Sequence, residues 1–95
     1  MESFIDLDYS MSGKNRFCSD GDRISVDSTK ECQKAAYAMK YEYREYHERY
    51  LKPRGCYFFH DTEKIYFNIH PAGIRNMDAE QICKGKGTHF FAWSE

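Results

Sequence analysis

The stretch that decides the fold is residues 56–70, CYFFHDTEKIYFNIH. Two runs rich in aromatic and β-branched residues, Cys56–His60 and Lys64–His70, flank the short polar segment Asp61–Glu63. This pattern predicts a β-hairpin with a short polar loop. In the second run, apolar side chains recur at every other position and so share one face of the strand: Ile65, Phe67 and Ile69.

A helix is predicted before this hairpin. Ser28 is a suitable N-cap, and Glu31 follows three residues later, which completes a capping box. At about 100° per residue, one face of the helix holds Cys32, Ala35, Ala36, Met39, Tyr43, Tyr46 and Tyr50. The helical pattern holds to about Lys40, is ambiguous over residues 41–46, and cannot pass Pro53.

The remaining segments complete a small sheet. Residues 23–26 predict a short strand, residues 77–83 a helical turn or a loop, and residues 88–93 a terminal strand. The predicted fold class is therefore α+β, with one principal helix packed on a small, mostly antiparallel sheet around a central β-hairpin. We expect residues 1–95 to form a single domain whose ordered core covers about residues 17–93.

Composition limits the size of the core and excludes two classes of protein. Leu, Ile and Val number nine, whereas Phe, Tyr and Trp number sixteen, so the apolar mass is mainly aromatic. No run approaches the roughly 18–20 apolar residues of a membrane-spanning helix. The net charge of −1 gives no overall basic field, so we expect no specific nucleic-acid partner. A core this poor in branched aliphatic residues needs other support.

The four cysteines are expected to supply that support as two disulfides. An even number of cysteines in a small chain, here Cys18, Cys32, Cys56 and Cys83, is typical of a disulfide-stabilised domain. Three pairings are permitted, and the connectivity stays open at this point. Cys32 on the inward helix face and Cys56 at the start of the hairpin can meet across the helix–sheet contact. That pairing would leave Cys18 and Cys83 to join the two ends of the ordered region.

Disulfides would place the domain in an extracellular or other oxidising compartment. Residues 1–8 have neither the basic nor the apolar region of a secretory signal. The chain is therefore expected to be either a mature domain of an oxidising compartment or a protein of a reducing one. The cysteine count favours the first.

No metal site, cofactor or catalytic residue is predicted. Structural zinc sites usually contain a close pair of cysteines, and the chain has no CxxC, although cysteine-held zinc and free thiols are the alternatives to disulfides. His60 and His70, with Asp61 and Glu63 between them, suggest a carboxylate–imidazole site, but ordinary polar strand ends explain them as well. No GxSxG, phosphate-loop or HExxH motif is present, so we do not expect an enzyme.

Short motifs around three of the cysteines resemble a known kind of module. They are Glu31-Cys32-x-x-Ala35-Ala36, Pro53-x-Gly55-Cys56-Tyr57, Tyr66-Phe67-Asn68 and Ile82-Cys83. Together they resemble a small four-cysteine module of predicted extracellular proteins in algae, protists and marine invertebrates, over residues 17–84. The resemblance implies a disulfide-held α+β unit and no activity or binding residue. The chain departs from that pattern in the charged stretch 41–51 and in its aromatic C-terminal tail.

The surplus of tyrosine is where the sequence points to function. Tyr37 and Tyr41 are four residues apart on the expected outer face of the helix, near Arg44, and exposed Tyr beside Arg is typical of protein interfaces. The C-terminal tail adds Phe91 and Trp93 as candidate partner-binding residues. The alternative is that the two tyrosines cover lysine stems or lie half-buried at an edge, and that the tail is a strand.

These features predict a non-enzymatic, disulfide-rich binding or structural module that recognises a protein or a glycan. One alternative is an accessory subunit of a larger assembly, such as a viral particle or a membrane-protein complex. Another is an intracellular zinc-binding protein.

Overall fold

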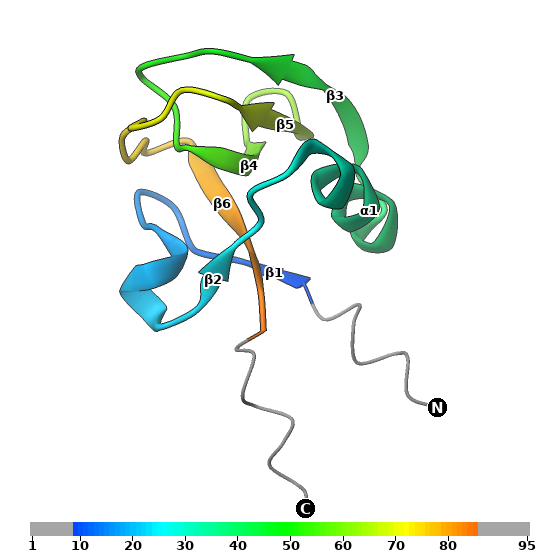
Figure 1. Ribbon diagram of the computed structural model, residues 1–95, viewed down its shortest axis with the longest axis horizontal. Helices are drawn as coiled ribbons and strands as arrows, with labels where there is room; N and C mark the ends of the chain where they lie inside the picture. Colours follow the sequence, from blue (N-terminus) through cyan, green and yellow to red (C-terminus); the bar gives the residue numbers. More distant parts are fainter. Residues whose placement is uncertain (1–8, 86–95) are drawn as a thin grey trace, which may run out of the picture.

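The computed structural model describes residues 9–85 (Figure 1). The elements are, in chain order, β1 (Tyr9–Met11), the 3₁₀ helix η2 (Cys18–Gly21), β2 (Ile24–Ser25), α1 (Thr29–Met39), β3 (Glu42–His47), β4 (Gly55–Phe59), β5 (Lys64–Asn68) and β6 (Ala79–Lys84). The predicted strand over residues 88–93, with Phe91 and Trp93, lies outside the described residues. No helix in the described part of the chain is long and apolar enough to cross a membrane.

The strands form one mixed sheet in the order β1-β6-β4-β5-β3, and β2 also pairs with β6. The hairpin predicted from residues 56–70 is confirmed, since β4 and β5 are antiparallel with Tyr57 opposite Tyr66. Among the described strand pairs, β3–β5 is parallel and the others are antiparallel. The predicted class, α+β with one helix on a mostly antiparallel sheet and two disulfides, is confirmed.

The strand β6 corrects the expectation of a helical turn or a loop over residues 77–83. Its first half pairs with β4, where Gln81 lies opposite Tyr57. Its second half pairs with both β1 and β2, where Cys83 lies opposite Ser10 and Ser25. A strand with neighbours on both sides satisfies its backbone hydrogen bonds in the sheet. Long-range pairing therefore decides the conformation of a segment whose own composition does not favour a strand.

The helix α1 begins and ends close to where the sequence predicts. The Ser28 hydroxyl accepts a hydrogen bond from the Glu31 N–H at 3.1 Å. At the other end, Lys40 is left-handed with a φ of +68°, and the Tyr41 N–H donates to the Ala36 carbonyl. This Schellman closure stops the helix. The expected inward helical face is therefore wrong for three residues, which lie in β3 or in the loop after it: Tyr43, Tyr46 and Tyr50.

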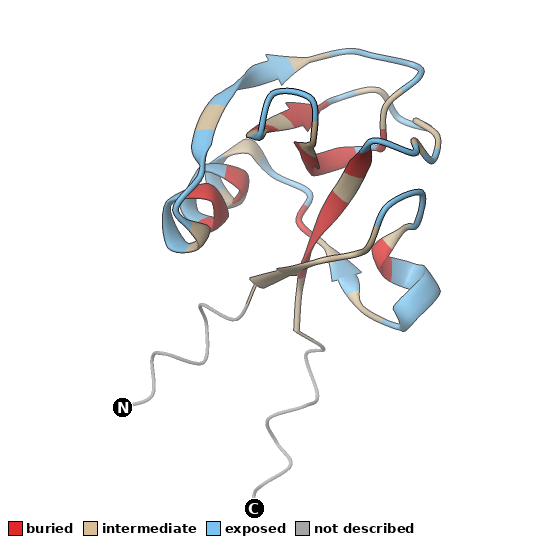
Figure 2. Cartoon of the chain, turned by 180° about the vertical axis from the view of Figure 1, so that it is seen from behind, coloured by how far each residue is buried: buried red, intermediate tan, exposed pale blue. Residues whose placement is uncertain are grey.

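Each disulfide joins elements that are far apart in the sequence. Cys32 of α1 is bonded to Cys56 of β4, and Cys18 of η2 to Cys83 of β6, with Cα–Cα distances of 5.4 and 5.6 Å. This is the pairing that the inward position of Cys32 favours. The core between α1 and the sheet consists of Val26, Cys32, Ala35, Ala36, Cys56, Phe58, Ile65, Phe67 and Ile82. Figure 2 shows these buried residues along the central strands and on the inner side of α1.

Two loops, rather than a second helix, cover the sheet face opposite α1. Cys56 and Phe58 belong to the helix-side core, so Tyr57 between them points to the opposite face. Tyr57 is buried there together with Asn68. The loop between β3 and β4 lies against Asn68, whose side chain hydrogen-bonds to the backbone of this loop. The loop after β5 contacts the β3–β4 loop in turn. These two loops carry the candidate site.

Candidate functional site

The structure places three of the predicted binding residues in different surroundings. Tyr37 lies on α1 and is 86% exposed. Tyr41 follows the helix, so its expected place on the outer helix face is wrong, and its ring lies 4.6 Å from the ring of the buried Phe58. Arg44 lies in β3 and forms an exposed ion pair with Glu42 at 3.0 Å. The three side chains therefore do not share one helical face.

Replacing Tyr37 and Tyr41 separately by Ala should distinguish a fully solvated side chain from a partly exposed one that packs on the core residue Phe58. We expect Tyr41→Ala to lower the free energy of unfolding by about 1–2 kcal/mol, because it uncovers Phe58 and removes an aromatic contact. Tyr37→Ala should change it by less than about 0.5 kcal/mol. Urea unfolding of the two variants gives both values, and equal losses would contradict the assignment.

His60 and His70, the two histidines considered for a carboxylate–imidazole site, have separate hydrogen-bond partners. The His60 Nε2 lies 2.7 Å from the Glu80 carboxylate. The His70 Nδ1 accepts hydrogen bonds from the Ala72 and Gly73 N–H groups, each at 3.1 Å. Residues 9–85 contain no group of three or more side chains that could hold a metal ion. The arrangement gives these histidines structural partners instead.

A β-turn between β3 and β4 carries two large apolar side chains, Tyr50 and Leu51. The Lys52 N–H donates to the Arg49 carbonyl at 3.3 Å, which puts Tyr50 and Leu51 at the two corners. These side chains are 60% and 61% exposed. Figure 2 shows the exposed chain from β3 into this loop. Helical periodicity hid the turn, because it assigned Tyr50 to an inward face.

The buried side chain of Asn68 holds this turn in place. Its Oδ1 accepts from the Arg49 N–H at 2.9 Å and from the His70 N–H at 3.1 Å. Its Nδ2 donates to the carbonyls of Arg49, Lys52 and Pro53 at 2.7, 3.1 and 2.9 Å. One side chain that is only 1% exposed thus fixes the backbone on both sides of the corner.

The loop after β5 braces the same turn from outside. The Asn76 Nδ2 donates to the Leu51 carbonyl at 3.1 Å, and the Ile74 N–H donates to the Lys52 carbonyl at 3.0 Å. Gly73 has a φ of +64°, and a Cβ there would lie 2.7 Å from the Lys52 carbonyl oxygen. Only glycine permits this approach of the two backbones. The corner is therefore rigid although its side chains are exposed.

Further exposed apolar residues adjoin the turn. The Tyr50 ring makes an edge contact with the His70 ring, with centroids 5.5 Å apart. Ile69, next to His70, is exposed, and its N–H donates to the His47 carbonyl at the end of β3. Tyr46, the neighbour of His47, is exposed as well. Apolar exposure thus continues from the turn to the ends of β3 and β5.

The charge around the turn is mainly positive. Burial lowers the pKa of His47, and the charges of Arg49 and Lys52 lower it further, against an opposing effect of Glu45. The His47 Nε2 lies 2.7 Å from the Tyr57 hydroxyl, whose pKa is raised, chiefly by burial. Both groups are therefore held neutral near neutral pH, and the basic residues dominate the field beside the turn.

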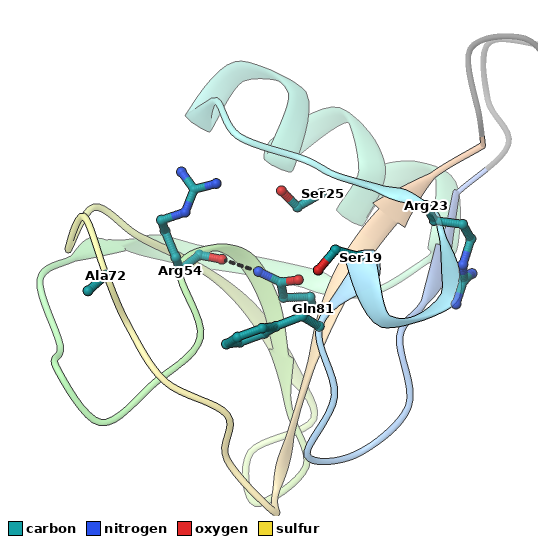
Figure 3. Close-up of a pocket in the computed structure, with 7 residues that line it drawn as sticks. Ser19, Arg23, Ser25, Arg54, Ala72 and Gln81 are labelled. Carbon is teal, nitrogen blue, oxygen red and sulfur yellow. Dashed lines mark hydrogen bonds between the residues drawn. The ribbon is translucent and has the colours of Figure 1, made fainter.

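A separate pocket of about 220 Å³ lies near Arg54 (Figure 3). In Figure 3 the guanidinium groups of Arg54 and Arg23 point away from Gln81. Arg23 donates instead to the Met11 carbonyl at 3.1 Å. Gln81 accepts from the Cys18 N–H at 2.7 Å and donates to the Arg54 carbonyl at 2.8 Å. The polar groups of this pocket thus serve the fold more directly than they serve a ligand.

Comparison of the chain with protein-family models, with curated proteins and with solved structures finds no match.

Proposed function

We propose that this domain is a non-enzymatic binding module that recognises a protein or glycan partner in an oxidising compartment. The observation that carries the proposal is a rigid turn with Tyr50 and Leu51 exposed at its corners. Exposed tyrosine on a fixed backbone is typical of binding surfaces, because little conformational entropy is lost when the partner is bound. The two disulfides are consistent with an oxidising compartment.

The chemistry of the described histidines and cysteines also favours binding over catalysis. All four cysteines are in disulfides, so none is available as a thiolate nucleophile. His47 and His60 are hydrogen-bonded to Tyr57 and Glu80.

The test compares the folded domain with the same chain after reduction and alkylation. Both are applied to a glycan array. Both are also immobilised and exposed to the secreted protein fraction of the native source. We expect the folded form alone to retain a glycan class or a protein. If neither probe is retained above the alkylated control, the binding proposal is wrong. Isolation of the chain only as part of an obligate complex would instead favour an accessory subunit.

A further inference from the structure

The two corner residues of the turn are unusual for that position. Corners of β-turns are normally occupied by Gly, Pro, Asn, Asp or Ser, whose backbone or side-chain chemistry suits the bend. Here Tyr50 and Leu51 occupy them, and each leaves about three-fifths of its surface in water. Burying the exposed apolar surface of such a side chain in a partner would favour binding. The fold itself makes little use of that apolar surface.

The backbone of the turn is also preorganised in the unbound protein. Asn68 makes five hydrogen bonds to backbone groups of the two loops, three of them to Arg49 and Lys52, the first and last residues of the turn. The brace from Asn76 adds a contact to the Leu51 carbonyl. A binding element that is already rigid avoids the ordering cost that weakens flexible loops.

The charge near the corner identifies the partner's chemistry. Arg49, Lys52 and Arg54 give three positive charges within six residues, and Glu48 lies just before them. Of these three basic residues, Arg54 alone has an ion-pair partner among the described residues, Asp27 at 3.5 Å. Burial is the main cause of the lowered pKa of His47, and the charges of Arg49 and Lys52 lower it further against the opposing charge of Glu45. A partner surface that complements this field carries acidic groups around the contact.

We propose that the Arg49–Lys52 turn is the recognition element, and that Tyr50 and Leu51 insert into an apolar pocket, rimmed by acidic side chains, on a partner protein. A convex corner with an aliphatic and an aromatic side chain fits a concave apolar site on a protein. A glycan would require a groove or platform with converging polar groups. The pocket of about 190 Å³ beside Ile69 and His70 is lined by neither Tyr50 nor Leu51. The inference rests on the proposed function and specifies its partner class.

The first experiment is site-specific photocrosslinking with the secreted protein fraction of the native source as the probe. A benzophenone amino acid replaces Tyr50 in one sample and Tyr37 in the matched control, because both positions are exposed and they lie on different elements. We expect one protein to be crosslinked at position 50 and not at position 37. The crosslinked peptide should lie beside Asp or Glu residues.

The second experiment measures the affinity of that purified protein for three variants. Combined Tyr50→Ser and Leu51→Ser should weaken binding by about 100-fold or more, as expected for two central contact residues. Combined Arg49→Ser and Lys52→Ser should weaken it by about tenfold at low salt and less at high salt. Tyr37→Ser should change it by less than twofold. Four of these side chains are exposed, whereas Lys52 is partly buried with its ammonium 3.8 Å from the centre of the Phe59 ring, so the melting temperature of each variant is measured as the folding control.

Several outcomes would overturn the inference while leaving the proposed binding function in place. They are crosslinking of a partner through position 37 instead, retention of glycans alone, full affinity in the Tyr50→Ser and Leu51→Ser variant, and a contact peptide rich in Lys and Arg. Crosslinking of a second copy of this chain at position 50 would replace the acidic partner by self-association. If folded and alkylated chains bind nothing at all, both proposals are wrong.

Discussion

Reduction of both disulfides is expected to unfold the domain at room temperature. In the chain-entropy model, the Cys18–Cys83 bond, with a sequence separation of 65, contributes about 4 kcal/mol to stability. The Cys32–Cys56 bond, with a separation of 24, contributes about 3.5 kcal/mol. The total stability of a domain this size is roughly 5–14 kcal/mol. The combined contribution of the two disulfides is thus comparable with the total free energy of unfolding.

The apolar core offers little to replace them. Of its nine members, four are Ala or Cys: Cys32, Ala35, Ala36 and Cys56. Hydrophobic burial in so small a core seldom exceeds the loss of chain entropy by much. Removing the crosslinks therefore removes the main restriction on the unfolded chain.

Urea unfolding followed by circular dichroism, with and without excess reductant, measures this effect. Two paired variants separate the contributions. Cys32→Ala with Cys56→Ala should leave a weakened but folded domain, and Cys18→Ala with Cys83→Ala should lose slightly more stability because its loop is longer. If the reduced chain keeps the cooperative transition of the oxidised one, the disulfides are not what supports this fold.

Local patterns predicted the parts of the fold that depend on neighbours in the sequence. The capping residues Ser28 and Glu31 located the start of α1, and the alternation of Ile65 with Phe67 located β5. The start of α1 and the strand β5 are each decided within one element. The disulfide connectivity stayed open among three pairings, although the inward position of Cys32 allowed a bond to Cys56, and the structure shows that bond.

Segments stabilised by distant partners could not be predicted in the same way. Residues 42–47 read equally well as helix, but they form β3 and pair in parallel with β5, where Tyr43 lies opposite Ile65. Residues 79–84 become β6 because β4, β1 and β2 all pair with them. Intrinsic propensity is a weak guide where such pairing decides the outcome.

The candidate site was missed for a related reason. Tyr37 and Tyr41 were predicted to share the outer face of the helix, yet Tyr41 packs on Phe58 after the helix has ended. The exposed Tyr50 lies at the corner of a turn defined by hydrogen bonds from Asn68, eighteen residues later. The nearby Pro53 and Gly55 signalled a break in the chain but not which side chains the break would expose.

Replacing Asn68 by Asp is expected to lower the free energy of unfolding by about 4 kcal/mol or more. The carboxylate keeps the acceptor for the Arg49 and His70 N–H groups but loses every donor. The carbonyls of Arg49, Lys52 and Pro53 would then face a buried negative oxygen instead of the amide. An unsatisfied buried polar group costs about 1–3 kcal/mol, and a buried charge costs more.

Asn76→Ala is the matched control, because Asn76 also donates to a backbone carbonyl of this turn but is only partly buried. Water can replace that hydrogen bond, so the expected loss is about 1 kcal/mol or less. Urea unfolding gives both values, and hydrogen exchange of the Arg49 and His70 amides reports on the turn itself. Protection of these two amides should fall in Asn68→Ala and remain in Asn76→Ala, since Asn68 alone accepts from both. Equal stability and equal protection in all three variants would mean that Asn68 does not hold the turn, and the rigid presentation of Tyr50 and Leu51 would lose its physical basis.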